Sequence, residues 1–299
     1  PLELSHRINV EGISILVVEA DFVFDEVFQE SGSLKLLGSC RNGLDHIDVE
    51  AATDHGVAVV NTPGRNSQGV AELTISLMLS LARGIPRLSC YVKGGLWQDP
   101  TEPYISMRGV ELHGRTLGII GLGSIGRKVA RLGKAFGMHT VAYDPYVGTP
   151  GSKKAGAMLN TLEEVLESSD FLSIHTAGTS ETERMLDRRR LGMMKTGSYV
   201  INTAAYHVIE EEALVEYLKS GHIAGAALDV HRTHPIQPSS LLLGLDNVIL
   251  TPHIGGATDG TVEKQSWIIV DEIHRFLRGR RPRHLVNGEV WRKVRVRHG

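Results

Sequence analysis

The chain has 299 residues, of which 41% are hydrophobic and 22% charged, and its formal net charge is −2. This length accommodates two domains with separate cores, and the composition excludes a disordered or fibrous chain. No apolar run approaches the ~18 residues of a membrane span, and the N-terminus lacks the basic-then-apolar pattern of a signal peptide. Two cysteines without a CxxC pair indicate a reducing compartment, so we expect a soluble cytoplasmic protein.

Short apolar runs alternate with helical patterns along the chain, and this alternation predicts an α/β protein with parallel sheets. In the first part of the chain, short buried strands are predicted at 13–20, 34–39 and 57–61. Helices are predicted at 48–55, and at 71–83, which is apolar almost all round and should therefore be buried. A loop-rich stretch with glycines and prolines follows at 94–113.

The second part of the chain carries a longer alternation of strands and helices. Strands are predicted at 116–121, 139–144, 170–175, 198–203, 224–230 and 247–253. Helical patterns separate most of them, at 126–136, 161–167, 187–194 and 210–220. Six parallel strands with intervening helices indicate a doubly wound nucleotide-binding domain. A long final helix is predicted at 261–277.

A glycine motif lies where the first of these six strands ends. The turn has the pattern GxGxxG and contains Gly121, Gly123, Ser124, Ile125 and Gly126. The pattern alone is a weak signal, but here it follows a strand and opens a helix, which raises its specificity. The glycines permit a tight turn, close approach of the backbone to a pyrophosphate, and close packing of helix on strand. The helix N-terminus stabilises the phosphate charge.

Asp144 ends the next predicted strand, 18 residues after Gly126. A carboxylate at this place accepts hydrogen bonds from the adenosine ribose hydroxyls and repels a 2′-phosphate. The sequence therefore predicts NAD, rather than NADP, as the cofactor.

Further segments carry a family resemblance: NGLDHIDVEAAT (42–53), NTPGRNSQGVAELT (61–74), YDP (143–145), INTAAYHVIEEEAL (201–214), ALDV (227–230) and LTPHIGGAT (250–258). In this order, and with the glycine motif, they resemble the D-isomer-specific 2-hydroxyacid dehydrogenases from about Ile13 to Glu289. The resemblance implies a Rossmann-type doubly wound NAD-binding domain and a second, smaller flavodoxin-like α/β substrate domain, with a cleft between them. It also implies a homodimer formed through the cofactor domain and the 94–113 loop.

The implied domain order places 1–84 in the substrate domain and 85–256 in the NAD-binding domain. Residues 257–299 form a C-terminal helix that returns to the substrate domain and a basic tail. In the family, a βαβ unit normally precedes the strand that matches 13–20, and this chain lacks most of that unit. We therefore expect a substrate domain that is truncated, disordered or naturally reduced at its N-terminus.

Three side chains perform the family's chemistry, and this chain keeps one of them. His253 matches the histidine that exchanges a proton with the substrate hydroxyl as a hydride moves between nicotinamide and substrate. The glutamate that holds this histidine is replaced by His234, and the arginine that clamps the substrate carboxylate is replaced by Ala205. These replacements predict slow turnover of ordinary 2-oxo acids unless other groups substitute.

Candidate substitutes lie in segments that face the cleft in the family. Arg41 and Arg65 can each bind an anion, and the alternative for each is a solvated loop arginine. In the family the backbone of the 41–44 loop, here with Asn42 and Gly43, also meets the substrate carboxylate.

Tyr206 and His207 stand where the family usually has two glycines. Bulky polar groups at these positions predict a substrate pocket that is smaller or differently shaped.

Several cofactor roles are implied by position in the family's motifs. Asp229 matches the residue that binds the nicotinamide amide, and Thr203 and Ala204 lie where the backbone lines the same ring. His175 matches a histidine near the ribose, although the following residues, TAGT (176–179), depart from the family's pattern.

A metal site is the alternative for the histidines. His231 and His234 have a three-residue spacing, and His207 and His253 could approach the same cleft to bind zinc or nickel. Because HRTHP reads as a loop, its sequence does not assure ligand geometry, and no metal is predicted.

The C-terminal segment from Arg275 to Gly299 has nine Lys and Arg against one acid, Glu289. No nucleic-acid-binding motif accompanies this charge, so packing on an acidic face of a subunit is favoured over a nucleic acid or a membrane.

Together these features predict an NAD-dependent dehydrogenase or reductase that transfers a hydride between nicotinamide and a small hydroxy acid or related hydroxy compound. The alternative is a catalytically weak NAD(H)-binding sensor or interaction protein. Retention of His253 favours the enzyme, whereas Ala205 and His234 favour the sensor.

Overall fold

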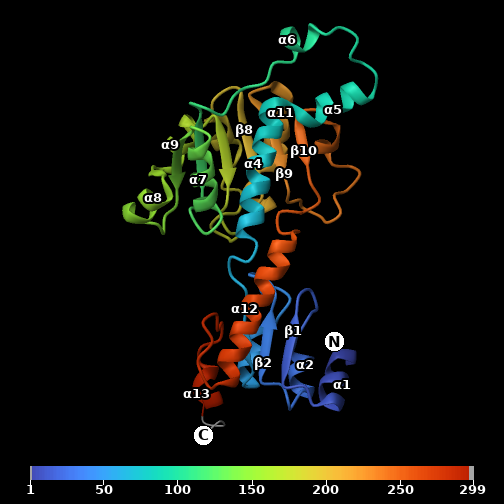
Figure 1. Cartoon of the computed structure of the whole chain (residues 1–299), viewed down its shortest axis with the longest axis vertical. Coiled ribbons are helices and arrows are strands. Elements are labelled where there is room, and N and C mark those ends of the chain that lie inside the picture. Colours follow the sequence, from blue (N-terminus) through green and yellow to red (C-terminus); the bar gives the residue numbers. More distant parts are fainter. Residues whose placement is uncertain (1, 296–299) are drawn as a thin grey trace. The chain divides into compact units, whose positions relative to one another are not determined.

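The computed structural model describes residues 2–295 and consists of two compact units (Figure 1). The first unit contains the chain up to Asn66 and from Asp259 onward, and the second runs from Ser67 to Thr258. The predicted boundaries were 1–84, 85–256 and 257–299.

The main difference from the predicted boundaries concerns helix α4 (Ser67–Arg83), which belongs to the second unit. Its apolar side chains, including Ile75 and Met78, share a core with Ile201 and Ala227 from strands of that unit. A helix so apolar must bury most of its surface, and the larger sheet provides the surface on which it packs.

In the first unit, three parallel strands form a sheet in the order β1 (Ile15–Val18), β2 (Leu36–Ser39) and β3 (Ala58–Val60). These confirm the three strands predicted in the first part of the chain. The helices of the unit are α1 (Leu2–Glu11), α2 (Asp25–Glu30), α3 (Val49–Asp54), α12 (Asp259–Leu277) and α13 (Val290–Arg295).

Both faces of this small sheet are covered. Leu37 and Val59 lie in the cluster that contains Phe28 of α2, whereas their neighbours Leu36 and Val60 lie in the cluster with side chains of α12 and α13. This alternation is that of a parallel sheet buried on both sides. The C-terminal segment is therefore an integral part of this unit, as the resemblance predicted for the C-terminal helix.

Part of the basic segment lies against this unit. Arg283 forms an ion pair with Asp271 of α12 at 3.3 Å, and the guanidinium of Arg275 donates hydrogen bonds to the backbone carbonyl of Arg281. Residues 296–299, the end of the predicted basic tail, lie outside the described residues.

The second unit contains a seven-stranded parallel sheet in the order β10-β9-β8-β7-β4-β5-β6. The strands are β4 (Thr116–Ile120), β5 (His139–Tyr143), β6 (Met158–Leu159), β7 (Phe171–Ile174), β8 (Ser198–Asn202), β9 (Ile223–Leu228) and β10 (Val248–Leu250). Six of these strands are as predicted, and the doubly wound α/β class is confirmed. The count of six was wrong because β6 has two residues, too few to show a strand pattern.

Helices cover both faces of this sheet, which Figure 1 shows in green, yellow and orange. Helices α4, α7 (Gly126–Ala135) and α8 (Thr149–Ala155) share one core with it, and α9 (Leu162–Ser168), α10 (Arg188–Gly192) and α11 (Glu211–Ser220) share the other. Helices α5 (Ile85–Lys93) and α6 (Glu102–Ser106) contain no buried residue. Short 3₁₀ helices lie at Tyr206–Val208 and Leu241–Gly244.

The strand order places the predicted site residues of this unit along one edge. From β4, the strands β5 and β6 are added toward one side of the sheet, and the strands from β7 to β10 are added toward the other side. The boundary between β4 and β7 is therefore the topological switch point, where doubly wound folds bind ligands. The residues that follow the carboxyl ends of strands are Gly121, Asp144, His175, Thr203, Asp229 and, after β10, His253.

Within residues 2–295, none of the helices combines the length and apolar character required to cross a membrane.

Candidate functional site

The glycine turn between β4 and α7 leaves space for a ligand. Gly121 has φ +91°, and a Cβ atom there would lie 2.7 Å from the carbonyl of His175, so β4 and β7 meet closely. A Cβ atom at Gly126 would lie 2.1 Å from the carbonyl oxygen of Gly121, whereas one at Gly123 would meet nothing within 4 Å. Gly123 and Ser124 are exposed, and α7 begins one residue after Ile125. The turn thus fits a pyrophosphate cradle that ends at a helix N-terminus.

Asp144 is held beside this turn by backbone hydrogen bonds. The amide of Leu122 donates to Oδ2 at 2.7 Å, and the amide of Tyr146 donates to Oδ1 at 2.9 Å. Each carboxylate oxygen can accept a second hydrogen bond, so both remain able to bind a ribose hydroxyl. The position agrees with the role predicted for Asp144 in NAD preference.

His175, across the switch point from Gly121, is a neutral histidine. Its Nε2 lies 2.8 Å from the hydroxyl of Ser173, and its Nδ1 is buried with no hydrogen-bond partner in the described chain. Burial lowers the pKa of His175 from 6.5 to about 3. An uncharged ring beside the glycine turn provides hydrogen-bonding capacity without adding charge near the pyrophosphate.

Asp229 organises the segment that carries His253. The carboxylate is 1% exposed and accepts hydrogen bonds from the hydroxyl of Thr251 at 2.6 Å and from the amides of Ile254 and Gly255, each at 2.8 Å. His253 lies between these donors with φ +57°, a left-handed conformation that is uncommon outside glycine. Such backbone strain persists only where the surroundings enforce it, and Asp229 provides that constraint.

His253 and His234 form a hydrogen-bonded pair. Nδ1 of His253 lies 3.2 Å from Nε2 of His234, and the two ring centroids are 5.2 Å apart. A third imidazole, His231, has its ring centroid 6.1 Å from that of His234. Burial lowers the pKa of His234, His253 and His231 lower it further, and Asp229 opposes them. His234 is therefore in its neutral form near neutral pH.

The segment after β8 is fixed by Asn202, which is not among the predicted site residues. The side chain of Asn202 accepts a hydrogen bond from the amide of Ala204 at 3.0 Å and donates one to the carbonyl of Ala205 at 2.9 Å. The hydroxyl of Thr203 lies 3.1 Å from that of Thr74. Asn202 sits inside the INTA motif, and this position was the only available signal for its role.

Ala205 contributes no charge to this segment and packs against a hydrophobic core. The next two side chains form an edge-to-face pair, with the rings of Tyr206 and His207 5.1 Å apart. A Cβ atom at Gly178 would lie 2.2 Å from Cε1 of His207, so the imidazole occupies space that any other residue at 178 would need. Gly178, within the TAGT segment (176–179) that departs from the family pattern, therefore provides the space for the bulky side chain of His207.

In the first unit, the two candidate arginines differ in availability. Arg65 has a side chain only 16% exposed, hydrogen-bonded to Gln265 and 3.8 Å from Glu19. Arg41 is exposed, and its guanidinium has no partner among the residues described. The backbone beside it is held by hydrogen bonds from Asn61 to the carbonyl of Asn42 and from Thr62 to that of Arg41, and Gly43 is exposed. Of the two, Arg41 is the one free to bind an anion.

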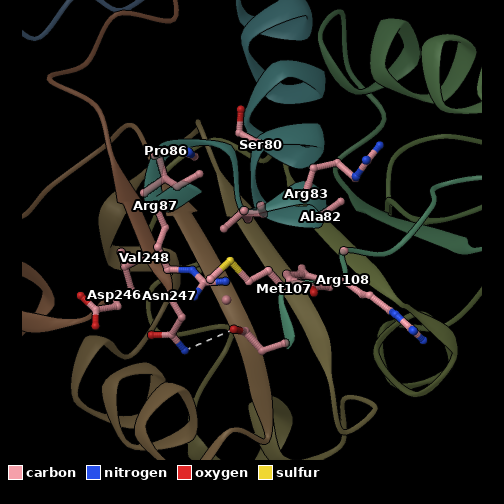
Figure 2. Close-up of a pocket in the computed structure, with 17 residues that line it drawn as sticks. Ser80, Ala82, Arg83, Pro86, Arg87, Met107, Arg108, Asp246, Asn247 and Val248 are labelled. Carbon is pink, nitrogen blue, oxygen red and sulfur yellow. Dashed lines mark hydrogen bonds between the residues drawn. The ribbon is translucent and has the colours of Figure 1, made fainter. Parts of the chain in front are cut away.

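A cavity of about 390 Å³ lies at the opposite, amino-terminal edge of the large sheet (Figure 2). Tyr199, Ala224 and Val248, near the beginnings of β8, β9 and β10, help to line it. Figure 2 shows Arg87 reaching into the cavity, whereas Arg83 and Arg108 point away from it. Because every candidate catalytic residue of this unit follows the other end of a strand, this cavity is separate from the candidate active site.

Within residues 2–295 there is no group of three or more His, Cys, Asp or Glu side chains placed to hold a metal ion.

Comparisons with known proteins agree with this geometry. The family model of the D-isomer specific 2-hydroxyacid dehydrogenase NAD binding domain matches residues 75–255. A D-3-phosphoglycerate dehydrogenase of Methanocaldococcus jannaschii is 38% identical over 281 residues, which are 93% of this chain and 52% of that protein. A glyoxylate reductase of Korarchaeum cryptofilum is 39% identical over 91% of this chain and 81% of its own length.

A solved structure is also similar. The D-lactate dehydrogenase of Aquifex aeolicus, complexed with NAD and lactic acid, has a TM-score of 0.77 and 31% identity, covering 92% of this chain and 87% of that one. The chain spans about half the length of the D-3-phosphoglycerate dehydrogenase that it matches.

Two glycine substitutions test the turn. Gly126→Ala forces a Cβ atom against the carbonyl of Gly121, so we expect a loss of about 1–3 kcal/mol in the free energy of unfolding together with weaker NADH binding. Gly123→Ala should fold like the wild type, because its Cβ meets nothing, and should lose only NADH affinity. Thermal unfolding and NADH fluorescence titration measure the two effects. Wild-type NADH affinity in Gly123→Ala would contradict the assignment of the turn.

The low pKa of His175 makes stability depend on pH. The unfolded chain binds a proton at this histidine below pH 6.5, whereas the folded chain binds it only near pH 3. The free energy of unfolding should therefore fall as pH drops through this range, by about 1.4 kcal/mol per unit from this group. His175→Gln should remove that part of the acid dependence in denaturant titrations, and substitution of the exposed His139 by Gln should not. Equal acid dependence in all three proteins would contradict the assignment.

Proposed function

The chain belongs to the D-isomer specific 2-hydroxyacid dehydrogenase family, and from that premise we propose that it is an NAD-dependent oxidoreductase. It transfers a hydride between the nicotinamide and a small hydroxy acid or a related hydroxy compound. The observation that carries this proposal is the His253–His234 pair, held by buried Asp229 on the same sheet edge as the glycine turn. Four strand spacings of ~4.8 Å separate β4 from β10 along that edge.

The cofactor is held by residues of the second unit. The turn from Gly121 to Gly126 would hold the pyrophosphate, and Asp144 would hold the adenosine ribose. Thr203, Ala204 and Asp229 would border the nicotinamide. The bound cofactor would supply hydride-transfer chemistry to the substrate carbon.

His253 handles the hydroxyl proton. Its Nδ1 is engaged with His234, so Nε2 is the nitrogen that gives a proton to the carbonyl oxygen or takes one from the hydroxyl. His234 is a positioning residue, because its hydrogen bond fixes the tautomer and ring orientation of His253. It can accept from a protonated His253 only while neutral, and its lowered pKa meets this condition.

The substrate end of the site lacks a fixed charge in the second unit. Ala205 is apolar, and Tyr206 and His207 present a hydroxyl and an imidazole that have no side-chain hydrogen bonds in the described chain. A carboxylate bound there would be held by neutral hydrogen bonds, which are weaker than those of a guanidinium. In the first unit, Arg41 is the candidate for binding an anion, because its side chain is exposed.

The names of the relatives support the substrate class. A glyoxylate reductase and a D-lactate dehydrogenase are proteins named for small 2-oxo or 2-hydroxy acids, and their similarity extends over nine-tenths of this chain. Small acids of this kind are therefore the first substrates to examine, followed by uncharged hydroxy compounds that need no clamp.

Two substitutions separate the roles of the paired histidines. His253→Gln removes the proton-transfer group, so kcat on the best 2-oxo acid should fall by about 10²–10⁴-fold while NADH affinity stays unchanged. His234→Glu places a carboxylate behind His253 and stabilises its charged form, so the pH–rate profile should shift upward by about one unit or more. Steady-state NADH oxidation from pH 5 to 9 measures both.

Circular dichroism and NADH fluorescence control for folding of these variants. An unchanged pH profile in His234→Glu would contradict the positioning role. NADH binding by the wild type without turnover of any acid or hydroxy compound would contradict the enzyme and leave the NAD(H) sensor.

We also propose that the chain forms a homodimer through the segment that contains α5 and α6. Large apolar side chains on it are exposed: Tyr104 by 78%, Ile105 by 74%, Leu96 by 61% and Trp97 by 51%. Exposed apolar side chains that are concentrated on one segment are typical of a protein–protein interface. The cavity that Arg87 enters is lined by residues at both ends of this segment, including Pro86 and Met107.

The dimer is tested by charge substitution on α6. Light scattering should give twice the chain mass of 32.6 kDa for the wild type, and Tyr104→Glu with Ile105→Glu should shift it toward the monomer. Met158→Glu, at an exposed apolar residue of the same unit, is the matched control and should remain dimeric. A monomeric wild type would refute the proposal.

A further inference from the structure

A second polar pocket lies between the first turn of α11 and the loop that follows β9. It has a volume of about 370 Å³ and is separate from the cavity of Figure 2. Its lining is polar apart from one isoleucine and consists of Glu211, His231, Arg232, Thr233, Ile236, Gln237, Ser239 and Ser240. None of the functions proposed above uses this pocket.

His231 lines this pocket and contains a buried nitrogen without a hydrogen-bond partner in the described chain. The residue is only 6% exposed, and its Nε2 lies 2.8 Å from the backbone carbonyl of Thr251. Because a carbonyl only accepts, Nε2 carries the proton, and Nδ1 of the neutral ring is an acceptor. Nδ1 is buried and has no partner in residues 2–295. A buried polar atom without a partner is energetically unfavourable, so a ligand that donates to it is favoured.

Glu211 and Arg232 bring opposite charges to the same pocket. Neither side chain forms a hydrogen bond or an ion pair with another described residue, although both line the cavity. Burial and the neighbouring Glu212 raise the pKa of Glu211, and Arg232 and His231 oppose this shift, so these side chains lie in one region. A carboxylate and a guanidinium that line one cavity but do not pair leave room for a molecule between them.

We propose that this pocket binds a small zwitterion of the amino-acid class. Its ammonium group binds Glu211 and supplies a donor toward Nδ1 of His231, and its carboxylate binds Arg232, which suits a planar two-oxygen partner. The hydroxyls of Ser239 and Thr233 and the amide of Gln237 favour a polar side chain on the ligand.

A ligand in the pocket should change the environment of His231, His234 and His253. His231 lies 6.1 Å from His234 in ring-centroid distance, and His234 is hydrogen-bonded to His253. A bound ligand changes the hydrogen bonding of His231, so the imidazole nitrogen resonances of His231 should move. This readout needs neither NADH nor turnover, so its failure and that of the proposed enzyme activity are distinguishable.

Calorimetric titration with three matched molecules tests the proposal. L-Glutamine is the zwitterion, glutaramate lacks its ammonium group, and 4-aminobutanamide lacks its carboxylate. We expect the wild type to bind glutamine, and to bind each of the other two at least about 10-fold more weakly, since each loses a charge-assisted interaction.

Variants assign the charges. Glu211→Gln should remove the preference for glutamine over glutaramate, and Arg232→Gln should remove the preference over 4-aminobutanamide. Glu212→Gln, at the exposed adjacent carboxylate, should bind as the wild type does. NADH titration verifies that each variant is folded.

Three results would overturn the proposal. They are no glutamine binding at millimolar concentration, equal binding of all three molecules, and equal losses in Glu211→Gln and Glu212→Gln. A shift of the His231 Nδ1 resonance on glutamine binding would support it, and binding without any shift would contradict the contact with His231.

Discussion

The candidate active site depends on the burial of one carboxylate, that of Asp229. A charge removed from water costs several kcal/mol unless hydrogen bonds stabilise it. Here the donors are the hydroxyl of Thr251 and the amides of Ile254 and Gly255, which flank His253 on both sides. The same bonds that stabilise Asp229 therefore hold His253 in a left-handed conformation. The contact of Asp229 with the nicotinamide amide stays a prediction.

The departures from the family pattern fit one another in space. The ring of His207 occupies the space that a Cβ atom at residue 178 would fill, and Gly178 has none. His234 forms a hydrogen bond with His253 from the position where the family has a glutamate. Ala205 packs into a hydrophobic core instead of leaving a void. The replaced residues are therefore accommodated by their neighbours within the second unit.

The sequence predicted most of the fold because hydrophobic runs and turn glycines are local signals. Nine of the ten strands within residues 2–295 were predicted, and β6 was missed because two residues show no periodicity. The site residues that follow strands were found through motifs. What could not be predicted depends on contacts between distant segments. The hydrogen-bond partners of Asp229 come from a segment more than 20 residues away in the sequence. The neutral state of His175 results from burial, which lowers its pKa. Arg65 is less free to bind an anion because its guanidinium donates a hydrogen bond to Gln265, 200 positions away in the sequence.

The most direct test of the account is to follow the hydride itself. The chain would be incubated with NADH that carries deuterium at C4, together with glyoxylate, hydroxypyruvate and an uncharged hydroxyketone, and the products examined by NMR. Hydride transfer at this sheet edge predicts deuterium on the carbon that becomes the hydroxyl-bearing centre of at least one product. Stoichiometric binding of the labelled NADH with no deuterium in any product would contradict the assignment of this sheet edge to hydride transfer.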